Sequence, residues 1–193
     1  MSPFFYSYLI TDPNEYGSDI ISFEKNLTQV LKSHHIDMIC FRDKTTKNII
    51  PLAKKCLDIA RKFNIPKVLI NGNIELAKAL GFDGVHLTSI QFNEIKNAKE
   101  QSLYTFISCH SENEIDFAKK NSADGVTFSP IFFKENKGDP KGCKTLENIV
   151  KKYQNDSFNI IALGGITDKE KLLKVKETKC KGFASITYFT NNL

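Results

Sequence analysis

The sequence predicts an α/β protein folded as a short (β/α)8 barrel, in which the last helix is reduced or missing. Short β-type runs alternate with amphipathic helical segments along almost the whole chain. Strict alternation favours parallel strands joined by right-handed crossovers, and eight such units most naturally close into a barrel. The chain has 193 residues, slightly fewer than the roughly 200 that usually form the lower bound of this fold. A doubly wound open sheet is the alternative architecture.

Each expected element can be placed by its pattern. The expected strands are Tyr6–Thr11, Met38–Arg42, Val68–Asn71, Gly84–Leu87, Tyr104–Cys109, Gly125–Phe128, Asn159–Leu163 and Gly182–Ile186. Amphipathic segments between them include Ile74–Leu80, Glu112–Asn121 and Lys169–Glu177. Ser111 and Glu114 have the spacing of a capping box, and Asp168 can cap the last of these helices. Only residues 188–193 follow the last strand, so the eighth helix is very short, missing or supplied by a neighbouring molecule.

Composition narrows the class of protein. We expect one domain over residues 1–193, because 41% of the residues are apolar and no linker interrupts the pattern. No secretion signal or membrane span is expected, and the five scattered cysteines are typical of reduced thiols in the cytoplasm. The formal charge of +5 comes almost entirely from lysine, without a basic stripe, which argues against nucleic acid. At most, the charge supports a modest attraction for a phosphorylated small molecule as the partner, and a homodimer is left open.

The ends of the expected strands carry the residues of chemical interest. Gly164 and Gly165 follow the seventh strand, where bare backbone N–H groups and the start of a helix can hold a phosphate. The alternative is a tight turn that needs positive φ. Arg42 and Lys44 follow the second strand and can clamp a phosphate or diphosphate. The alternative is a surface ion pair, but Arg42 is one of only two arginines in the chain.

Three further strand ends contribute polar side chains. Asn71 can donate to a phosphate oxygen or satisfy the loop backbone. His86 lies within an apolar strand and is interpreted as a core histidine rather than a base. Ser108 and His110 share one face, so Ser108 can bind an anion and His110 can transfer a proton. No spacing supports a metal site formed by Cys40, His86 and His110.

A long loop follows the sixth expected strand, with the sequence SPIFFKENKGDPKGCK. Its length and its lysines, Lys134, Lys137 and Lys141, are suited to a lid that closes over an anionic substrate. A solvated loop without this role is the alternative.

Taken together, these motifs resemble the thiamin phosphate synthase and TenI family. The resemblance is carried in order by YLITD, the F-R-x-K core of CFRDK, LINGN-x-E-L-A, GVHL, ISCHS, SPIF-x(4)-K, IALGGI and SIT. It runs from Tyr8 to Thr187 and implies the TIM-barrel fold. It also implies a reaction that joins an aminopyrimidine diphosphate to a thiazole phosphate. The diphosphate leaves first, and the thiazole nitrogen captures the resulting pyrimidine cation.

The resemblance assigns roles to residues of this chain. It implies diphosphate binding by Arg42, Lys44, Asn71, Ser108 and Lys137. It implies thiazole phosphate binding by the backbone of Gly164, Gly165, Ile186 and Thr187, and Lys134 adds a positive charge near that anion. The candidate catalytic residues are Arg42, Lys44, Ser108 and His110.

The chain departs from the family at the metal site. The synthase holds Mg²⁺ with two aspartates, and the matching positions here are Gly72 and Gln91. Glycine has no side chain, and a neutral amide is a weak magnesium ligand. We therefore expect no protein metal site, Mg²⁺ only as a complex of the diphosphate, and weak synthase activity.

Other departures keep three functions open. The glutamine before F-R is Cys40, and two threonines of the long loop are Lys134 and Asn136. The tautomerase branch uses a histidine where this chain has Pro130, so a thiazole tautomerase would need His110 instead. A synthase, a tautomerase and a non-catalytic, regulatory binding protein for thiazole or thiamin phosphate are the three candidates. The surviving clamp favours the synthase.

Overall fold

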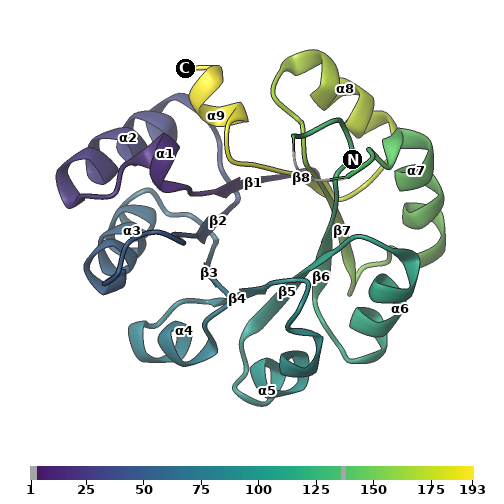
Figure 1. The fold of residues 1–193 in the computed structure, drawn as a ribbon, viewed down its shortest axis with the longest axis horizontal. Helices are drawn as coiled ribbons and strands as arrows, with labels where there is room; N and C mark the ends of the chain where they lie inside the picture. The colour runs from purple at the N-terminus through teal and green to yellow at the C-terminus, as the bar shows by residue number, and fades with distance from the viewer. Residues whose placement is uncertain (1–3, 136–137) are drawn as a thin grey trace.

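Parallel strands close into a barrel, as a computed structural model of the protein shows for residues 4–135 and 138–193. Within these residues eight strands follow one another around the ring in sequence order, β1 to β8 (Figure 1). They are β1 Tyr6–Ile10, β2 Met38–Phe41, β3 Lys67–Asn71, β4 Gly84–Leu87, β5 Tyr104–Cys109, β6 Gly125–Phe128, β7 Asn159–Leu163 and β8 Gly182–Ser185. β1 pairs with both β2 and β8, so the sheet has no free edge and the open-sheet alternative is wrong.

Helices surround the ring on its outside (Figure 1). They are α1 Pro13–Tyr16, α2 Ile20–Ser33, α3 Ile50–Lys62, α4 Ile74–Leu80, the 3₁₀ turn η1 Phe92–Glu94, α5 Ile95–Glu100, α6 Glu112–Lys120, α7 Gly142–Tyr153, α8 Lys169–Glu177 and α9 Tyr188–Asn191. The expectation of a reduced last helix is confirmed, because α9 has only four residues. No helix in the described ranges is long and apolar enough to cross a membrane.

Side-chain caps that the sequence predicts mark the starts of two helices, α6 and α8. The hydroxyl of Ser111 accepts from the backbone N–H of Glu114, and the carboxylate of Glu114 accepts from the backbone of Ser111, which confirms the capping box. Asp168 caps α8 by accepting from the backbone N–H of Lys171, also as expected. Each cap fixes where a helix leaves the carboxyl end of a strand.

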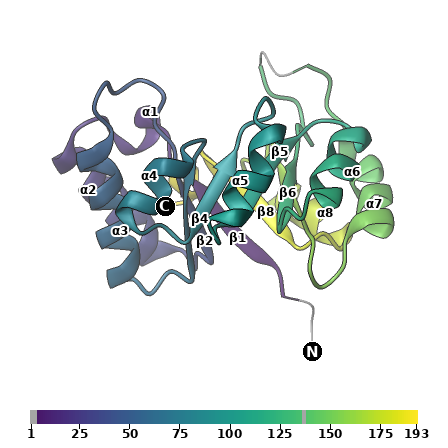
Figure 2. The ribbon, with the colours of Figure 1, turned by 90° about the horizontal axis from the view of Figure 1, so that it is seen from below.

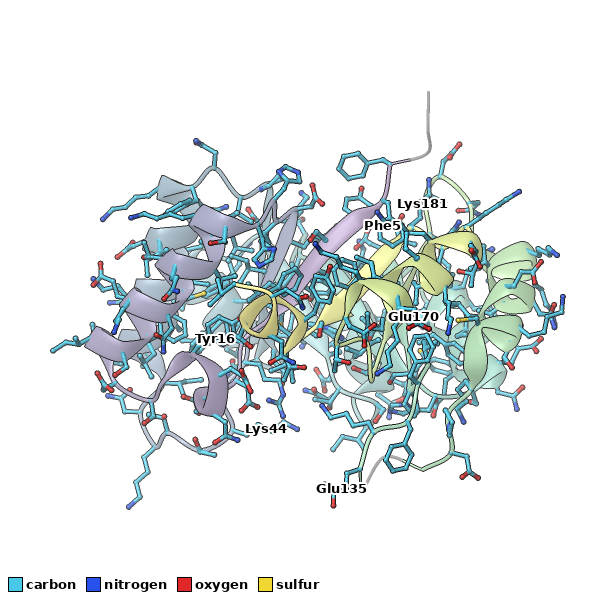
Figure 3. The ribbon with its side chains drawn as sticks, turned by 90° about the horizontal axis from the view of Figure 1, so that it is seen from above. Phe5, Tyr16, Lys44, Glu135, Glu170 and Lys181 are labelled. Carbon is cyan, nitrogen blue, oxygen red and sulfur yellow. The ribbon has the colours of Figure 1, made fainter. Side chains whose placement is uncertain are left out.

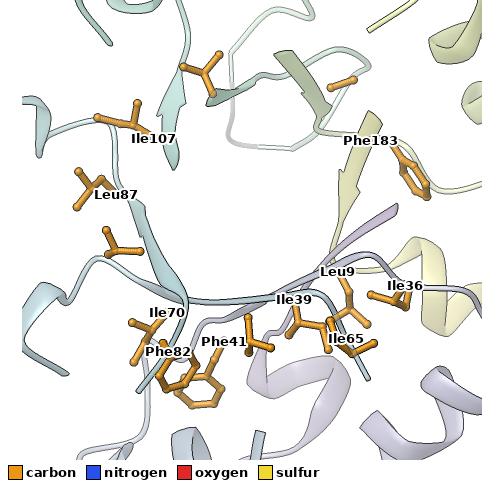
Figure 4. Close-up of a cluster of buried hydrophobic side chains, with 14 of the residues drawn as sticks. Leu9, Ile36, Ile39, Phe41, Ile65, Ile70, Phe82, Leu87, Ile107 and Phe183 are labelled. Carbon is orange, nitrogen blue, oxygen red and sulfur yellow. The ribbon is translucent and has the colours of Figure 1, made fainter. Parts of the chain in front are cut away.

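The core has two layers that the strand alternation separates. The inner layer fills the barrel with Tyr8, Ile10, Met38, Cys40, Leu69, Phe106, Ile161 and Ala184. The larger outer layer lies between strands and helices, and Figure 4 shows Leu87 and Ile107 pointing outward from the ring. Cys40 faces inward and Cys109 outward. All five cysteines, which lie within the described residues, are free thiols.

Three expected strands end one residue early, and two of these ends share one cause. The backbone N–H of Arg42 donates to the hydroxyl of Thr11 at 2.8 Å, and that hydroxyl donates to the Arg42 carbonyl at 3.0 Å. Side-chain hydrogen bonds therefore replace the ladder beyond β1 and β2, and the chain turns outward there. Ile186 likewise lies just beyond β8.

The two ends of the barrel carry different residues. Figure 3 shows Lys44 and Glu135 at one end and Phe5 and Lys181 at the other. The first end is the one where the strands finish, and the β6–α7 loop rises from it (Figure 2). Active sites of such barrels are built at this end from the loops that follow the strands.

Candidate functional site

A cavity of about 230 Å³ lies at the carboxyl end of the barrel. It gathers most of the residues that the sequence analysis singled out, namely Arg42, Lys44, Asn71, Ser108, His110, Lys134, Gly164 and Ile186. Gly165 and Thr187 are adjacent in sequence to lining residues but do not themselves line it. Lys137 lies outside the described residues. Segments far apart in the sequence thus line the same cavity.

Arg42 is held at the rim by Asp12. One guanidinium nitrogen of Arg42 is paired with the carboxylate of Asp12, the residue that also caps α1. Both side chains are largely buried, and of the two only Arg42 lines the cavity. Within the described residues the guanidinium makes no other hydrogen bond, which leaves N–H groups for an anion.

A buried network supports Ser108 from inside the barrel. The Nδ1 atom of His86 lies 2.8 Å from the Tyr8 hydroxyl. Its Nε2 atom lies 3.1 Å from the Ser108 hydroxyl and 3.3 Å from the Thr127 hydroxyl. His86 is only 2% exposed, and burial, together with the charge of Arg42, lowers its pKa to about 4. The ring is therefore neutral at physiological pH, as a core histidine should be, and it also lines the cavity.

His110 has a defined tautomer. Its Nδ1 atom lies 2.9 Å from the backbone carbonyl of Ser129, and a carbonyl can only accept. The proton of the neutral ring is therefore on Nδ1, and Nε2 carries the lone pair. A histidine arranged in this way at a cavity can accept a proton through Nε2.

Asn71 serves the backbone in this structure. Its amide nitrogen donates to the carbonyl of His86 at 2.9 Å, which joins β3 to β4. This contact supports the second of the two readings of Asn71, satisfaction of backbone. Its amide oxygen still faces no partner among the described residues.

The two glycines after β7 are required by the turn. Gly164 has φ +97° and Gly165 has φ +70°, which confirms the tight-turn reading. A Cβ on Gly164 would lie 2.8 Å from Pro130 Cα, and one on Gly165 would lie 2.7 Å from the Phe133 carbonyl oxygen. A side chain at Gly165 would therefore strike the β6–α7 loop.

Backbone donors remain beside this turn. Among the described residues, the N–H groups of Gly165, Ile186 and Thr187 donate to no other protein group. Unpaired donors grouped beyond the ends of β7 and β8 can bind an anion. The turn and the phosphate site are thus compatible readings of the same residues.

The two positions where the family carries metal-binding aspartates do not fit Mg²⁺ here. The amide oxygen of Gln91 accepts from the backbone N–H of Thr88 at 3.0 Å and from its hydroxyl at 2.8 Å. Its amide nitrogen donates to the carbonyl of Gly72 at 2.8 Å. No carboxylate is present at either position, and the one amide oxygen is already engaged.

Sequence reasoning missed three residues of the site. Tyr8 and Thr127 contact His86 from inside the barrel, and Asp12 holds Arg42. A signal existed for Thr127, because it is a polar residue within an otherwise apolar strand. Only the closed barrel, however, shows that Thr127 on β6 lies against His86 on β4.

Fold and cavity together define a (β/α)8 barrel with positively charged side chains and hydrogen-bond donors at the carboxyl end of its strands. The family model described as thiamine monophosphate synthase matches residues 7–189. The chain belongs to the thiamin phosphate synthase/TenI family, as its motifs predict.

Individual relatives agree with this assignment. A protein of Aquifex aeolicus provisionally named thiamine-phosphate synthase 2 is 32% identical over 94% of this chain and 96% of its own length. The thiamine-phosphate synthase of Latilactobacillus sakei is 30% identical, with 95% and 84% covered.

Solved structures support the fold. A thiamine phosphate pyrophosphorylase from Pyrococcus furiosus superposes with a TM-score of 0.78 at 22% identity, covering 96% of this chain and 90% of that one. An N-acetylmannosamine-6-phosphate 2-epimerase from Clostridium perfringens reaches 0.72 at 10% identity, with 94% and 86% covered. Because proteins of different activity share this barrel, the superpositions support the fold and not a particular activity.

Proposed function

We propose that the protein is a thiamin phosphate synthase-like transferase with slow turnover. It would join an aminopyrimidine diphosphate to a thiazole phosphate and release diphosphate. The observation that carries the proposal is the gathering of both implied anion subsites around one cavity. The cavity lining includes Arg42 and Ser108, to which we assign the diphosphate, and Gly164 and Ile186, to which we assign the thiazole phosphate.

The first step is departure of the diphosphate. The bond between the pyrimidine methylene carbon and the diphosphate oxygen breaks, and its electron pair stays on the oxygen. Negative charge grows on the leaving group, so cations and donors that hold it lower the barrier. We assign this role to Arg42, Lys44, Asn71, Ser108 and Lys137. The placement of Arg42 by Asp12 supports the assignment, because a fixed guanidinium loses little freedom on binding.

The second step forms the new bond. The thiazole nitrogen donates its lone pair to the methylene carbon, so the positive charge moves to the thiazolium ring. The thiazole would be held by its phosphate on the backbone N–H groups of Gly164, Gly165, Ile186 and Thr187. Lys134, which lines the same cavity, would add positive charge. We expect the protein itself to supply no Mg²⁺ site, so that any Mg²⁺ would enter only as a complex of the diphosphate. We also expect this chemistry to take place in the cytoplasm.

A second candidate activity is a thiazole tautomerase. The specific observation in its favour is His110, whose Nδ1–H donates to Ser129 and whose Nε2 can accept a proton. A third candidate is a non-catalytic protein that binds thiazole or thiamin phosphate. It is favoured by the two positions that lack a carboxylate, Gly72 and Gln91.

The test is a single-turnover assay with enzyme in excess over the aminopyrimidine diphosphate and thiazole phosphate, with and without Mg²⁺. Thiamin phosphate should form slowly, and Arg42→Ala should form less. Isomerised thiazole phosphate without thiamin phosphate would support the tautomerase. Binding of thiamin phosphate with no product in any arm would support the binding protein.

A further inference from the structure

The side chain of Gln91 joins the loop after β3 to the loop after β4. Its amide nitrogen donates to the carbonyl of Gly72, and its amide oxygen accepts twice from Thr88. Both polar atoms of the amide are therefore used. Its backbone is fixed as well, because the Gln91 N–H donates to the Thr88 carbonyl and the Gln91 carbonyl accepts from the Glu94 N–H.

Gly72 fits closely against this amide. It has φ +68°, and a Cβ built on it would lie 3.1 Å from the Gln91 amide oxygen. The Gly72 N–H donates to the carbonyl of His86 at 2.9 Å, which also receives the amide of Asn71. Among the residues that the structure describes, the hydrogen bonds that hold the β3 and β4 loops together are thus neutral. Two carboxylates at these positions would repel one another and would need a cation between them.

The charge of the cavity wall agrees with this arrangement. Arg42, Lys44 and Lys134 line it, and no aspartate or glutamate lines it among the described residues. A divalent cation would find no anionic ligand in this wall, since Mg²⁺ takes oxygen ligands that usually include carboxylates. A phosphate or diphosphate anion would find lysine, arginine and hydroxyl donors.

We propose that this mouth binds diphosphate as the free anion, without a metal ion, and that the Gln91 amide bridge takes the structural place of the ion. This proposal rests on the proposed function for the location of the diphosphate. It goes beyond that function because it makes Mg²⁺ unnecessary both for ligand binding and for the geometry of the two loops.

The first test is calorimetric titration of the wild-type protein with inorganic pyrophosphate, once in EDTA and once in excess Mg²⁺. The affinity in EDTA should equal or exceed that in Mg²⁺. Binding about tenfold or more weaker in EDTA, a difference of about 1.4 kcal/mol, would overturn the proposal.

The second test uses Gln91→Glu, which keeps the shape but replaces the NH₂ donor with a carboxylate oxygen facing the Gly72 carbonyl. Two acceptors would then face each other, so the melting temperature should fall by several degrees in EDTA and recover with Mg²⁺. The matched control is Gln101→Glu, which alters an exposed amide that bonds only to Asn97. The wild type and the control should melt at the same temperature with and without Mg²⁺.

The two tests separate failure of this inference from failure of the proposed function. No pyrophosphate binding in either buffer would contradict the diphosphate clamp, and the melting data would then decide on the bridge by themselves. A wild-type melting temperature that rises with Mg²⁺ in the absence of pyrophosphate would overturn the bridge. So would a Gln91→Glu variant that melts like the wild type in EDTA.

Discussion

The Nε2 atom of the buried His86 lies 3.1 Å from the hydroxyl oxygen of the half-buried Ser108. The other ring nitrogen is engaged with Tyr8, so the ring cannot rotate without losing a contact at both ends. Ser108 is consequently held at the cavity in one orientation. His86 acts through Ser108 and is a positioning residue in this account.

His86→Asn should lower stability and remove part of its pH dependence. The native pKa of His86, about 4, lies below the ordinary value of 6.5, so between these values the unfolded chain binds a proton that the native state does not. The stability that His86 contributes is complete above pH 6.5 and is lost as the pH falls toward 4, by an amount on the order of 3 kcal/mol. Urea unfolding at pH 7, 5.5 and 4 measures this.

Asparagine does not titrate and cannot reach all three hydroxyl partners of His86. The variant should therefore be less stable at pH 7 by about 1–3 kcal/mol, with a smaller further loss on acidification. Parallel pH profiles for wild type and variant would show that His86 is not the titrating group.

Arg42→Lys should weaken pyrophosphate binding by about tenfold. Lysine keeps the charge but loses the fork of N–H donors that lets one group hold Asp12 and an anion together. The control is Arg61→Lys. Arg61 is bound to Asp83 by two hydrogen bonds of 2.9 Å at the start of β4, away from the carboxyl ends of the strands. Calorimetry should find unchanged affinity in the control. Equal losses in both variants would argue for a general charge effect.

Gly165→Ala should destabilise the protein more than Gly81→Ala. Both glycines have positive φ, +70° and +76°, so each alanine costs about 1 kcal/mol of backbone strain. A Cβ on Gly81 meets nothing within 4 Å, whereas one on Gly165 would lie 2.7 Å from the Phe133 carbonyl oxygen. Urea unfolding compares the two, and equal losses would mean that the β6–α7 loop moves aside freely.

Lys134→Gln should weaken the binding of thiazole phosphate several-fold and reduce its salt dependence, because a charge at the cavity is removed. Lys151→Gln is the control, since Lys151 lies on α7 and pairs with Glu147. Calorimetry at low and moderate salt makes the comparison. Identical salt dependence in the wild type and Lys134→Gln would remove Lys134 from the phosphate site.

The sequence was informative wherever short-range pattern and topology coincide. The strands Gly84–Leu87 and Asn159–Leu163 and the capping box at Ser111 were predicted to the residue, because alternation and capping act over a few positions. Parallel strands that close in order bring their carboxyl ends together, so Arg42, Asn71 and Ser108 could be placed at one mouth without knowledge of any contact.

Contacts between distant strands were beyond this reasoning. Gln91 was interpreted as a lost metal ligand, whereas the structure shows an amide that bridges to Gly72 across 19 positions. The surroundings of Gly165 were equally beyond prediction from the sequence. The Cβ would meet Phe132 and Phe133 of the neighbouring loop, which a linear pattern cannot place.

The measurement that tests the account most directly is a steady-state assay of thiamin phosphate formation by the wild type and by Gly72→Asp with Gln91→Asp, across a range of Mg²⁺ concentrations. The double variant restores both carboxylates and removes the amide that a side chain at Gly72 would contact at 3.1 Å. We expect slow wild-type turnover that gains little from Mg²⁺, and faster, Mg²⁺-dependent turnover in the double variant. Rapid wild-type turnover that requires Mg²⁺ and does not rise in the double variant would contradict the account.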